Sequence, residues 1–119
     1  MRPLRAAVAA CVPALALAAL GCGGSKAEDE KPATVAVLDN AFHRGVDRPV
    51  VRLSAGQRVT WRWRSRQSHG VAVRAGPERF AGAIRSGGSF THRFARAGTY
   101  RLECPLHAPG MRMVVVVRS

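Results

Sequence analysis

Three side chains with sulfur or nitrogen donor atoms lie within eight residues near the C-terminus: Cys104, His107 and Met111. A thiolate, an imidazole and a thioether together suit copper, which can change between two oxidation states. Blue-copper electron-transfer sites combine two histidines and one cysteine with a weak axial methionine. The segment from Cys104 to Met111 therefore predicts three ligands of one copper ion, and a second histidine must come from elsewhere in the chain.

His69 is the preferred candidate for that second histidine. It follows the polar turn Ser65–Ser68 and begins a predicted strand, which places it at an end of the fold. His43 lies in an early loop and is a weaker candidate. His92 is also weaker, because it shares its strand phase with two phenylalanines and is expected to be packed and hydrogen-bonded.

The elements that must position these residues are predicted to be strands. Short runs of alternating apolar residues, separated by Gly, Pro and Ser clusters, indicate an all-β protein, and no helix is expected after residue 33. Tyr100 and Leu102 alternate in phase with Cys104, so the cysteine sulfur should point into the top of the core. The predicted strands are Thr34–Leu38, Val50–Leu53, Gln57–Arg64, His69–Arg74, Ser89–Phe94, Thr99–Cys104 and Met111–Arg118, with a looser segment through Ile84. Seven or eight strands at this spacing favour a Greek-key β-sandwich or barrel.

Residues 1–21 have the pattern of an export signal. Two arginines near the start precede the uncharged apolar run 6–20, and a glycine stands before Cys22. The run is shorter than the about 20 apolar residues that a membrane-spanning helix needs. The tetrapeptide ending at Cys22 resembles a bacterial lipobox and predicts lipidation of Cys22. A plain secretory signal, cut near Gly23 or Ser25, is the alternative.

Residues 22–33 are small, polar or charged and predict a flexible linker. The remaining 34–119 form one small domain. Cys11 lies within the signal and Cys22 is the lipid site, so Cys104 is the lone cysteine of the domain. This excludes a disulfide within a monomer, and it favours a metal ligand over an unprotected thiol in an exported protein.

The domain is strongly basic. Residues 34–119 contain 15 Arg and no Lys against four acidic residues, a net charge of +11. Such a surface favours acidic partners or anionic membrane faces. Nucleic acid is not expected as a partner, because the domain is exported and has neither a recognition helix nor an aromatic stacking platform.

Residues 34–118 resemble the cupredoxins of the plastocyanin, amicyanin and pseudoazurin type. The matching segments are Phe42, Ala55–Trp61, Ser68–Val71, Gly88–Phe90 with Phe94, Gly98–Tyr100, Cys104–Met111 and Met113–Val117. In that family the histidine after the tryptophan-bearing strand is the first copper ligand. The resemblance therefore implies the ligand set His69, Cys104, His107 and Met111 around one Cu(I)/Cu(II) ion.

Two features depart from the family pattern. Three residues separate His107 from Met111, where familiar members have two or four, so Met113 stands as an alternative axial ligand. Gly70 occupies a position where many members have an asparagine whose side chain steadies the cysteine-bearing loop. Because such support tunes a metal site, the reduction potential does not follow from the resemblance.

The resemblance implies a monomeric one-electron carrier that is not itself an enzyme. His107 is expected near the surface, ringed by Leu106, Ala108 and Pro109, with arginines steering an acidic redox partner such as a c-type cytochrome or a membrane oxidase. The predicted location is the extracytoplasmic or periplasmic face of the cell membrane, through the lipid on Cys22. The alternatives are copper storage or delivery to an oxidase, and a metal-free adhesion or assembly lipoprotein.

Overall fold

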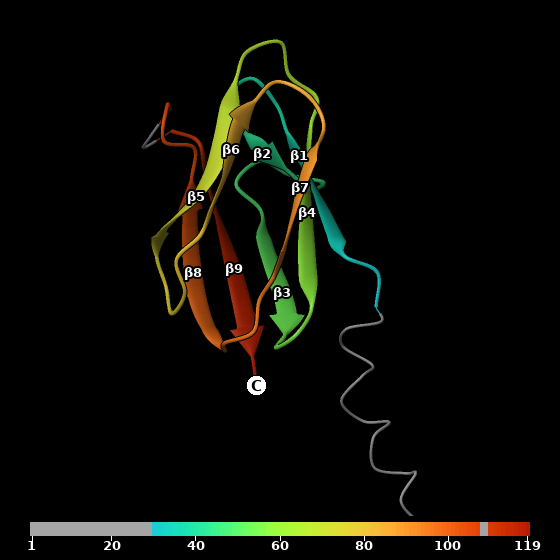
Figure 1. The fold of residues 1–119 in the computed structure, drawn as a ribbon, viewed down its shortest axis with the longest axis vertical. Coiled ribbons are helices and arrows are strands. Elements are labelled where there is room, and N and C mark those ends of the chain that lie inside the picture. Colours follow the sequence, from blue (N-terminus) through green and yellow to red (C-terminus); the bar gives the residue numbers. More distant parts are fainter. Residues whose placement is uncertain (1–29, 108–109) are drawn as a thin grey trace, which may run out of the picture.

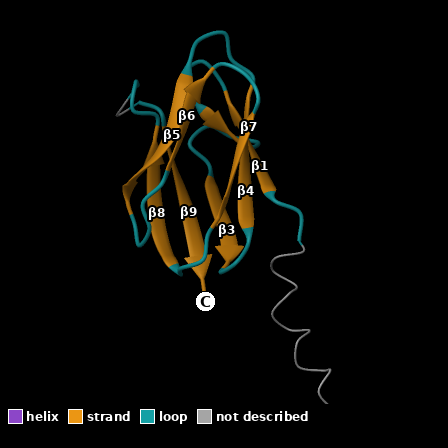
Figure 2. Ribbon diagram, viewed as in Figure 1, coloured by secondary structure: helices purple, strands orange, loops and turns teal. Residues whose placement is uncertain are grey.

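The computed structural model describes residues 30–107 and 110–119, which form nine strands in two packed sheets (Figures 1 and 2). The four-stranded sheet has the order β2 (Phe42–His43), β1 (Ala33–Val37), β4 (Arg58–Trp63) and β7 (Ser89–Arg93). The five-stranded sheet has the order β3 (Val50–Ser54), β9 (Arg112–Arg118), β8 (Gly98–Glu103), β5 (His69–Ala75) and β6 (Ala81–Arg85). The predicted all-β sandwich is confirmed.

Alternation along the strands builds the core between the sheets. In β4, Val59, Trp61 and Trp63 are buried while the residues between them face outward. Trp61 stacks on Phe90 of β7 at a ring-centroid distance of 5.7 Å, and Tyr100 of β8 is fully buried. Burial of a large apolar side chain stabilises the folded state by about 1.5–3 kcal/mol. These aromatic residues therefore contribute much of the stability of the core.

The valine-rich strand β9 lies inside its sheet, between β3 and β8. It pairs in parallel with β3 and antiparallel with β8. Met113, Val115 and Val117 are buried, whereas Val114 and Val116 are half-buried. The strand therefore has an interior position in its sheet and is fully buried on one face only.

Two strands were not expected as separate elements. β2 has two residues, too few for a period to be visible in the sequence. β6 falls in the segment that was predicted to be loose, and it forms the edge of the five-stranded sheet beside β5. Its residues are exposed or half-buried and include two alanines and a glycine, so it lacks the apolar alternation of a half-buried strand.

The topology brings three distant segments to one end of the sandwich. Because β5 and β8 are antiparallel, the first residue of β5 lies near the last residues of β8. The loop from β8 to β9 lies at the same end, away from the C-terminus (Figure 1). Within residues 30–107 and 110–119, no helix has the length and apolar character needed to cross a membrane.

Candidate metal centre

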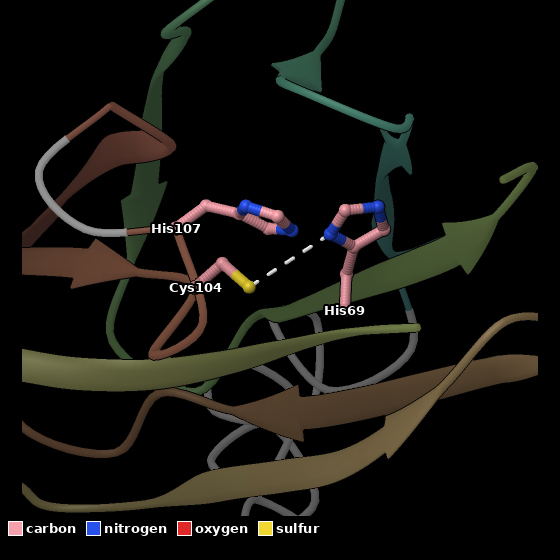
Figure 3. Close-up of side chains that lie close together, drawn as sticks. All are labelled: His69, Cys104 and His107. Carbon is pink, nitrogen blue, oxygen red and sulfur yellow. Dashed lines mark hydrogen bonds between the residues drawn. The ribbon is translucent and has the colours of Figure 1, made fainter. Parts of the chain in front are cut away.

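His69, Cys104 and His107 converge at this end of the sandwich, although they come from β5 and from the loop after β8 (Figure 3). One donor atom from each lies within 4.8 Å of the others. Nδ1 of His69 is 3.9 Å from Sγ of Cys104, and the two imidazole centroids are 4.7 Å apart. With metal–ligand bonds of about 2.0–2.3 Å, two ligands of one ion lie about 3.5–4 Å apart. The spacing therefore fits a single metal ion.

The ligand loop is closed by backbone hydrogen bonds at both ends. Cys104 N–H donates to Met111 O at 3.0 Å, and His107 N–H donates to Cys104 O at 3.1 Å. Gly110 and Met111 both donate to His107 O, at 2.9 and 3.2 Å. These bonds connect His107 to Cys104, Gly110 and Met111, so the cysteine and the histidine are held together by the backbone itself.

Asp39, in the turn after β1, orients the buried ring of His69. Its Oδ1 accepts the N–H groups of Arg66 and Gln67, both at 2.9 Å, and lies 3.3 Å from Nε2 of His69. The hydrogen bond from Gln67 N–H is the main cause that lowers the pKa of Asp39, and the contact with His69 acts in the same direction. A carboxylate on one ring nitrogen leaves the other nitrogen to the metal. Asp39 was not among the site residues predicted from the sequence.

Two neutral N–H groups support the other parts of the site. Gly70 N–H lies 3.4 Å from Sγ of Cys104 and can donate to it. The indole N–H of Trp63 donates to the carbonyl oxygen of His69 at 2.9 Å. A Cβ on Gly70 would approach Cδ1 of Ile84 to 2.8 Å. A side chain at position 70 therefore requires only the flexible end of the Ile84 side chain to move.

The two methionines of this region have different surroundings. Met111 is buried, and its backbone is bonded to Cys104 and His107. Met113 is also buried, and its sulfur lies 3.3 Å from the indole nitrogen of Trp61 in the core. The sulfur of Met113 therefore accepts a hydrogen bond from the indole N–H of Trp61. Met111 is the methionine whose backbone is bonded to the ligand loop.

The two weaker histidine candidates lie outside the cluster. Nδ1 of His43 is 3.0 Å from a carboxylate oxygen of Asp47. His92 stacks on Phe80 with centroids 3.7 Å apart, and its Nε2 is 3.3 Å from Glu78. His92 is therefore the packed, hydrogen-bonded residue that was expected. Cys22, the predicted lipid site, lies outside the described residues.

The site has a buried side and an exposed side. His69 and Cys104 are fully buried, whereas His107 is exposed. Leu106, the residue before it, is 56% exposed, and Ile84, whose Cδ1 lies close to Gly70, is 49% exposed. Ala108 and Pro109 lie outside the described residues. One thiolate and two imidazoles suit a soft or borderline transition-metal ion, and His107 links such a site to the surface.

Comparison with solved structures supports the fold and the site together. A Cu(I) form of an amicyanin variant matches with 26% identity and a TM-score of 0.62, covering 73% of this chain and 82% of that chain. A reduced Cu(I) form of another amicyanin variant at pH 4 matches with 27% identity and a TM-score of 0.63, covering 75% and 84%. The fold is therefore cupredoxin-like, as the sequence predicted.

A Cu-containing nitrite reductase from Thermus scotoductus also matches, with 24% identity and a TM-score of 0.63. The match covers 81% of this chain but 24% of that chain, so it shows the fold alone. No protein-family model matches the chain, and no curated protein matches it either.

Proposed function

We propose that this protein is a mononuclear copper protein that carries single electrons. The observation that carries the proposal is the convergence of the buried Cys104 with His69 and His107, whose donor atoms lie within 4.8 Å of one another. Copper supplies reversible one-electron chemistry in such a set of ligands. The similarity to amicyanin in its Cu(I) and oxidised forms supports the same assignment.

Met111 completes the proposed site as the weak axial ligand. It is buried at the end of the ligand loop, and the sulfur of Met113 is already engaged by Trp61. Its backbone hydrogen bonds to Cys104 and His107 hold Met111 close to these two ligands. Axial ligation tunes the reduction potential of such sites, so Met111 sets the potential more than it holds the metal.

The protein holds its ligands in place and makes no bond to a substrate. Asp39 fixes the ring of His69, Gly70 N–H faces the Cys104 sulfur, and the backbone bonds fix His107. A site that changes little in geometry needs little reorganisation when an electron arrives or leaves. This favours a carrier over an enzyme.

Electrons enter or leave through His107 in this proposal. His107 is exposed, and so is the apolar side chain of Leu106, the residue before it. A partner that covers this patch would come within contact of a copper ligand. The net charge of +12 over the full chain favours an acidic redox partner, such as a c-type cytochrome or a membrane oxidase. The chain is further proposed to act as a monomer on the extracytoplasmic or periplasmic membrane face, held by a lipid on Cys22.

Copper loading with optical spectroscopy tests the proposal. The full chain with one Cu(II) should give the intense thiolate-to-copper band and a reversible reduction potential, and Cys104→Ala should abolish both while the sandwich still folds. His43→Ala is the matched control, because His43 lies outside the cluster. A colourless protein that gives up Cu(I) readily to a chelator would instead indicate storage or delivery. Unchanged metal content in Cys104→Ala would contradict the site.

A further inference from the structure

Four arginines line one cavity beside the ligand loop, on the outer side of the five-stranded sheet. They are Arg48 before β3, Arg74 of β5, Arg101 of β8 and Arg112 of β9. The cavity has a volume of about 150 Å³, and the rest of its lining comes from Val114 and from the strands at Leu102 and Met113, whose side chains are buried in the core. Four segments that are distant in the sequence thus bring positive charge to one small, partly apolar space.

The negative charge at this place does not balance the positive charge. Oε1 of Glu103 lies 3.7 Å from Nε of Arg74 and 3.8 Å from Nε of Arg112. Both distances are too long for a hydrogen bond. The Nε atom of Arg112 is buried and has no hydrogen-bond partner among the described residues. One carboxylate shared between two of four guanidinium groups leaves donors unsatisfied.

Arg48 connects this cavity to the ligand loop. Its Nη2 donates to the carbonyl oxygen of Gly110 at 3.2 Å. Its backbone has φ of 53°, which is unfavourable for a residue with a side chain. Glycine would adopt this backbone conformation with less strain. The backbone conformation therefore does not explain why position 48 is an arginine. Strained positions of this kind are often functional.

We propose that the cavity binds a compact oxyanion, a phosphate or a carboxylate group. Guanidinium groups match both anions through paired, charge-assisted hydrogen bonds. A volume of about 150 Å³ is large enough to admit one such group. The proposal does not depend on which metal the neighbouring site holds.

Titration of the metal-free full chain with inorganic phosphate, at constant ionic strength, tests the proposal by calorimetry. One phosphate should bind per chain, and Arg74→Gln with Arg101→Gln should weaken binding by about tenfold or more. The matched control is Arg62→Gln with Arg64→Gln, which removes the same charge from exposed positions on and just after β4. The control should change the affinity by less than about twofold, since diffuse attraction is screened by salt. Equal losses in both variants, or no saturable binding, would overturn the proposal.

Two single substitutions keep the test open if the double variant does not fold. Glu103→Gln removes the competing carboxylate and should tighten phosphate binding by about threefold or more. Arg48→Gly relieves the backbone and removes one guanidinium, so it should weaken binding without lowering the thermal midpoint. A tighter complex in Arg48→Gly, or a weaker one in Glu103→Gln, would contradict the assigned roles.

A second titration identifies the source of the oxyanion. A tetraglutamate peptide that competes with phosphate at millimolar concentration would indicate acidic side chains of a protein. Phosphate binding without competition by the peptide would indicate a free anion. Both results support an oxyanion cavity, whereas peptide binding that survives in Arg74→Gln with Arg101→Gln would place the peptide elsewhere and oppose it.

Discussion

Asp39 Oδ1 lies 3.3 Å from Nε2 of His69, while Nδ1 of the same ring faces the Cys104 sulfur at 3.9 Å. The two ring nitrogens therefore have separate tasks. Backbone N–H groups of Arg66 and Gln67 hold the carboxylate in place and keep the pKa of Asp39 below its ordinary value. Asp39 remains ionised in the folded protein at neutral pH and fixes the ring with Nδ1 toward the metal position.

Asp39→Ala should weaken metal affinity by about 10–100-fold, because support of this kind orients a ligating histidine. Asp39→Asn keeps an oxygen that can accept hydrogen bonds from the backbone N–H groups, so it should lose less metal affinity than Asp39→Ala. Competition with a chelator of known affinity measures the effect. Asp47→Ala is the control, since Asp47 contacts His43 rather than the cluster. Equal affinities for Asp39→Ala and the original chain would exclude the positioning role.

Substituting the two methionines separately should distinguish their roles. Met111→Leu removes the proposed axial donor and should raise the reduction potential, because a weaker donor set disfavours the higher oxidation state. Met113→Leu leaves the indole N–H of Trp61 without its sulfur acceptor. It should cost about 1–2 kcal/mol of stability with little change in potential. Voltammetry and urea denaturation measure the two effects, and the reverse pattern would make Met113 the axial ligand.

Gly98→Ala should destabilise the fold by about 2–4 kcal/mol. Gly98 has φ of 143°, and a Cβ there would lie 2.5 Å from Cγ of Pro77. The proline ring cannot rotate away as a flexible side chain can. Gly87→Ala is the control, because a Cβ on Gly87 meets nothing within 4 Å. Urea denaturation of both variants makes the comparison, and equal midpoints would show that the β7–β8 connection tolerates a side chain.

Tyr100 should give the protein an alkaline limit of stability. Burial and the nearby Glu78 carboxylate raise the pKa of Tyr100 to about 12, and its hydroxyl donates to the carbonyl oxygen of Arg96 at 2.6 Å. A raised pKa in the folded state means that the stabilisation is complete below about pH 10 and is lost as the pH rises toward 12. Tyr100→Phe should be less stable at neutral pH and should lose this alkaline dependence. Chemical denaturation at pH 8, 10 and 11 measures it; an unchanged dependence in the variant would assign it to another group.

Glu78 should contribute to the loss of stability at acid pH. Burial raises its pKa, but hydrogen bonds from Arg96 N–H, His92 and Tyr100 outweigh burial and hold the pKa below its ordinary value. Its stabilisation is therefore present above about pH 4.5 and is lost as the pH falls through the lowered pKa. Glu78→Gln should be less stable than the original chain at pH 7, and the two should approach each other at pH 3. Denaturation at both pH values checks this; a constant difference would contradict it.

The strands whose side chains alternate could be predicted from the sequence. Val59, Trp61 and Trp63 are buried as their spacing indicated, and so are Tyr100, Leu102 and Cys104. The edge strand β6 was not predicted, because it buries little and shows no apolar period. β6 pairs with β5 through backbone hydrogen bonds, and these do not require a particular pattern of side chains.

The ligands His69, Cys104 and His107 could also be predicted from the sequence. Thiolate and imidazole groups are rare, and the spacing of Cys104 and His107 is short, so the residues themselves carry the signal. Asp39 lies 30 residues before His69 in the sequence, and aspartate in a turn is common. A signal for it would have been the alignment of β1 and β4, which are parallel partners with Val37 opposite Trp63. That register places the turn after β1 near the segment before His69.

The parallel pairing of β3 with β9 has a consequence for the order in which the strands assemble during folding. Residues 50–54 wait for residues 114–118 before their side of the five-stranded sheet can form, and pairings this distant in sequence form slowly. The loop with Cys104 and His107 lies between the last two strands, so its closure belongs to the same late step. Until β9 pairs with β3 and β8, the Cys104 thiol has no sandwich to bury it. The chain is therefore most open to oxidation before it folds, and copper that binds afterwards meets a thiol already shielded from solvent.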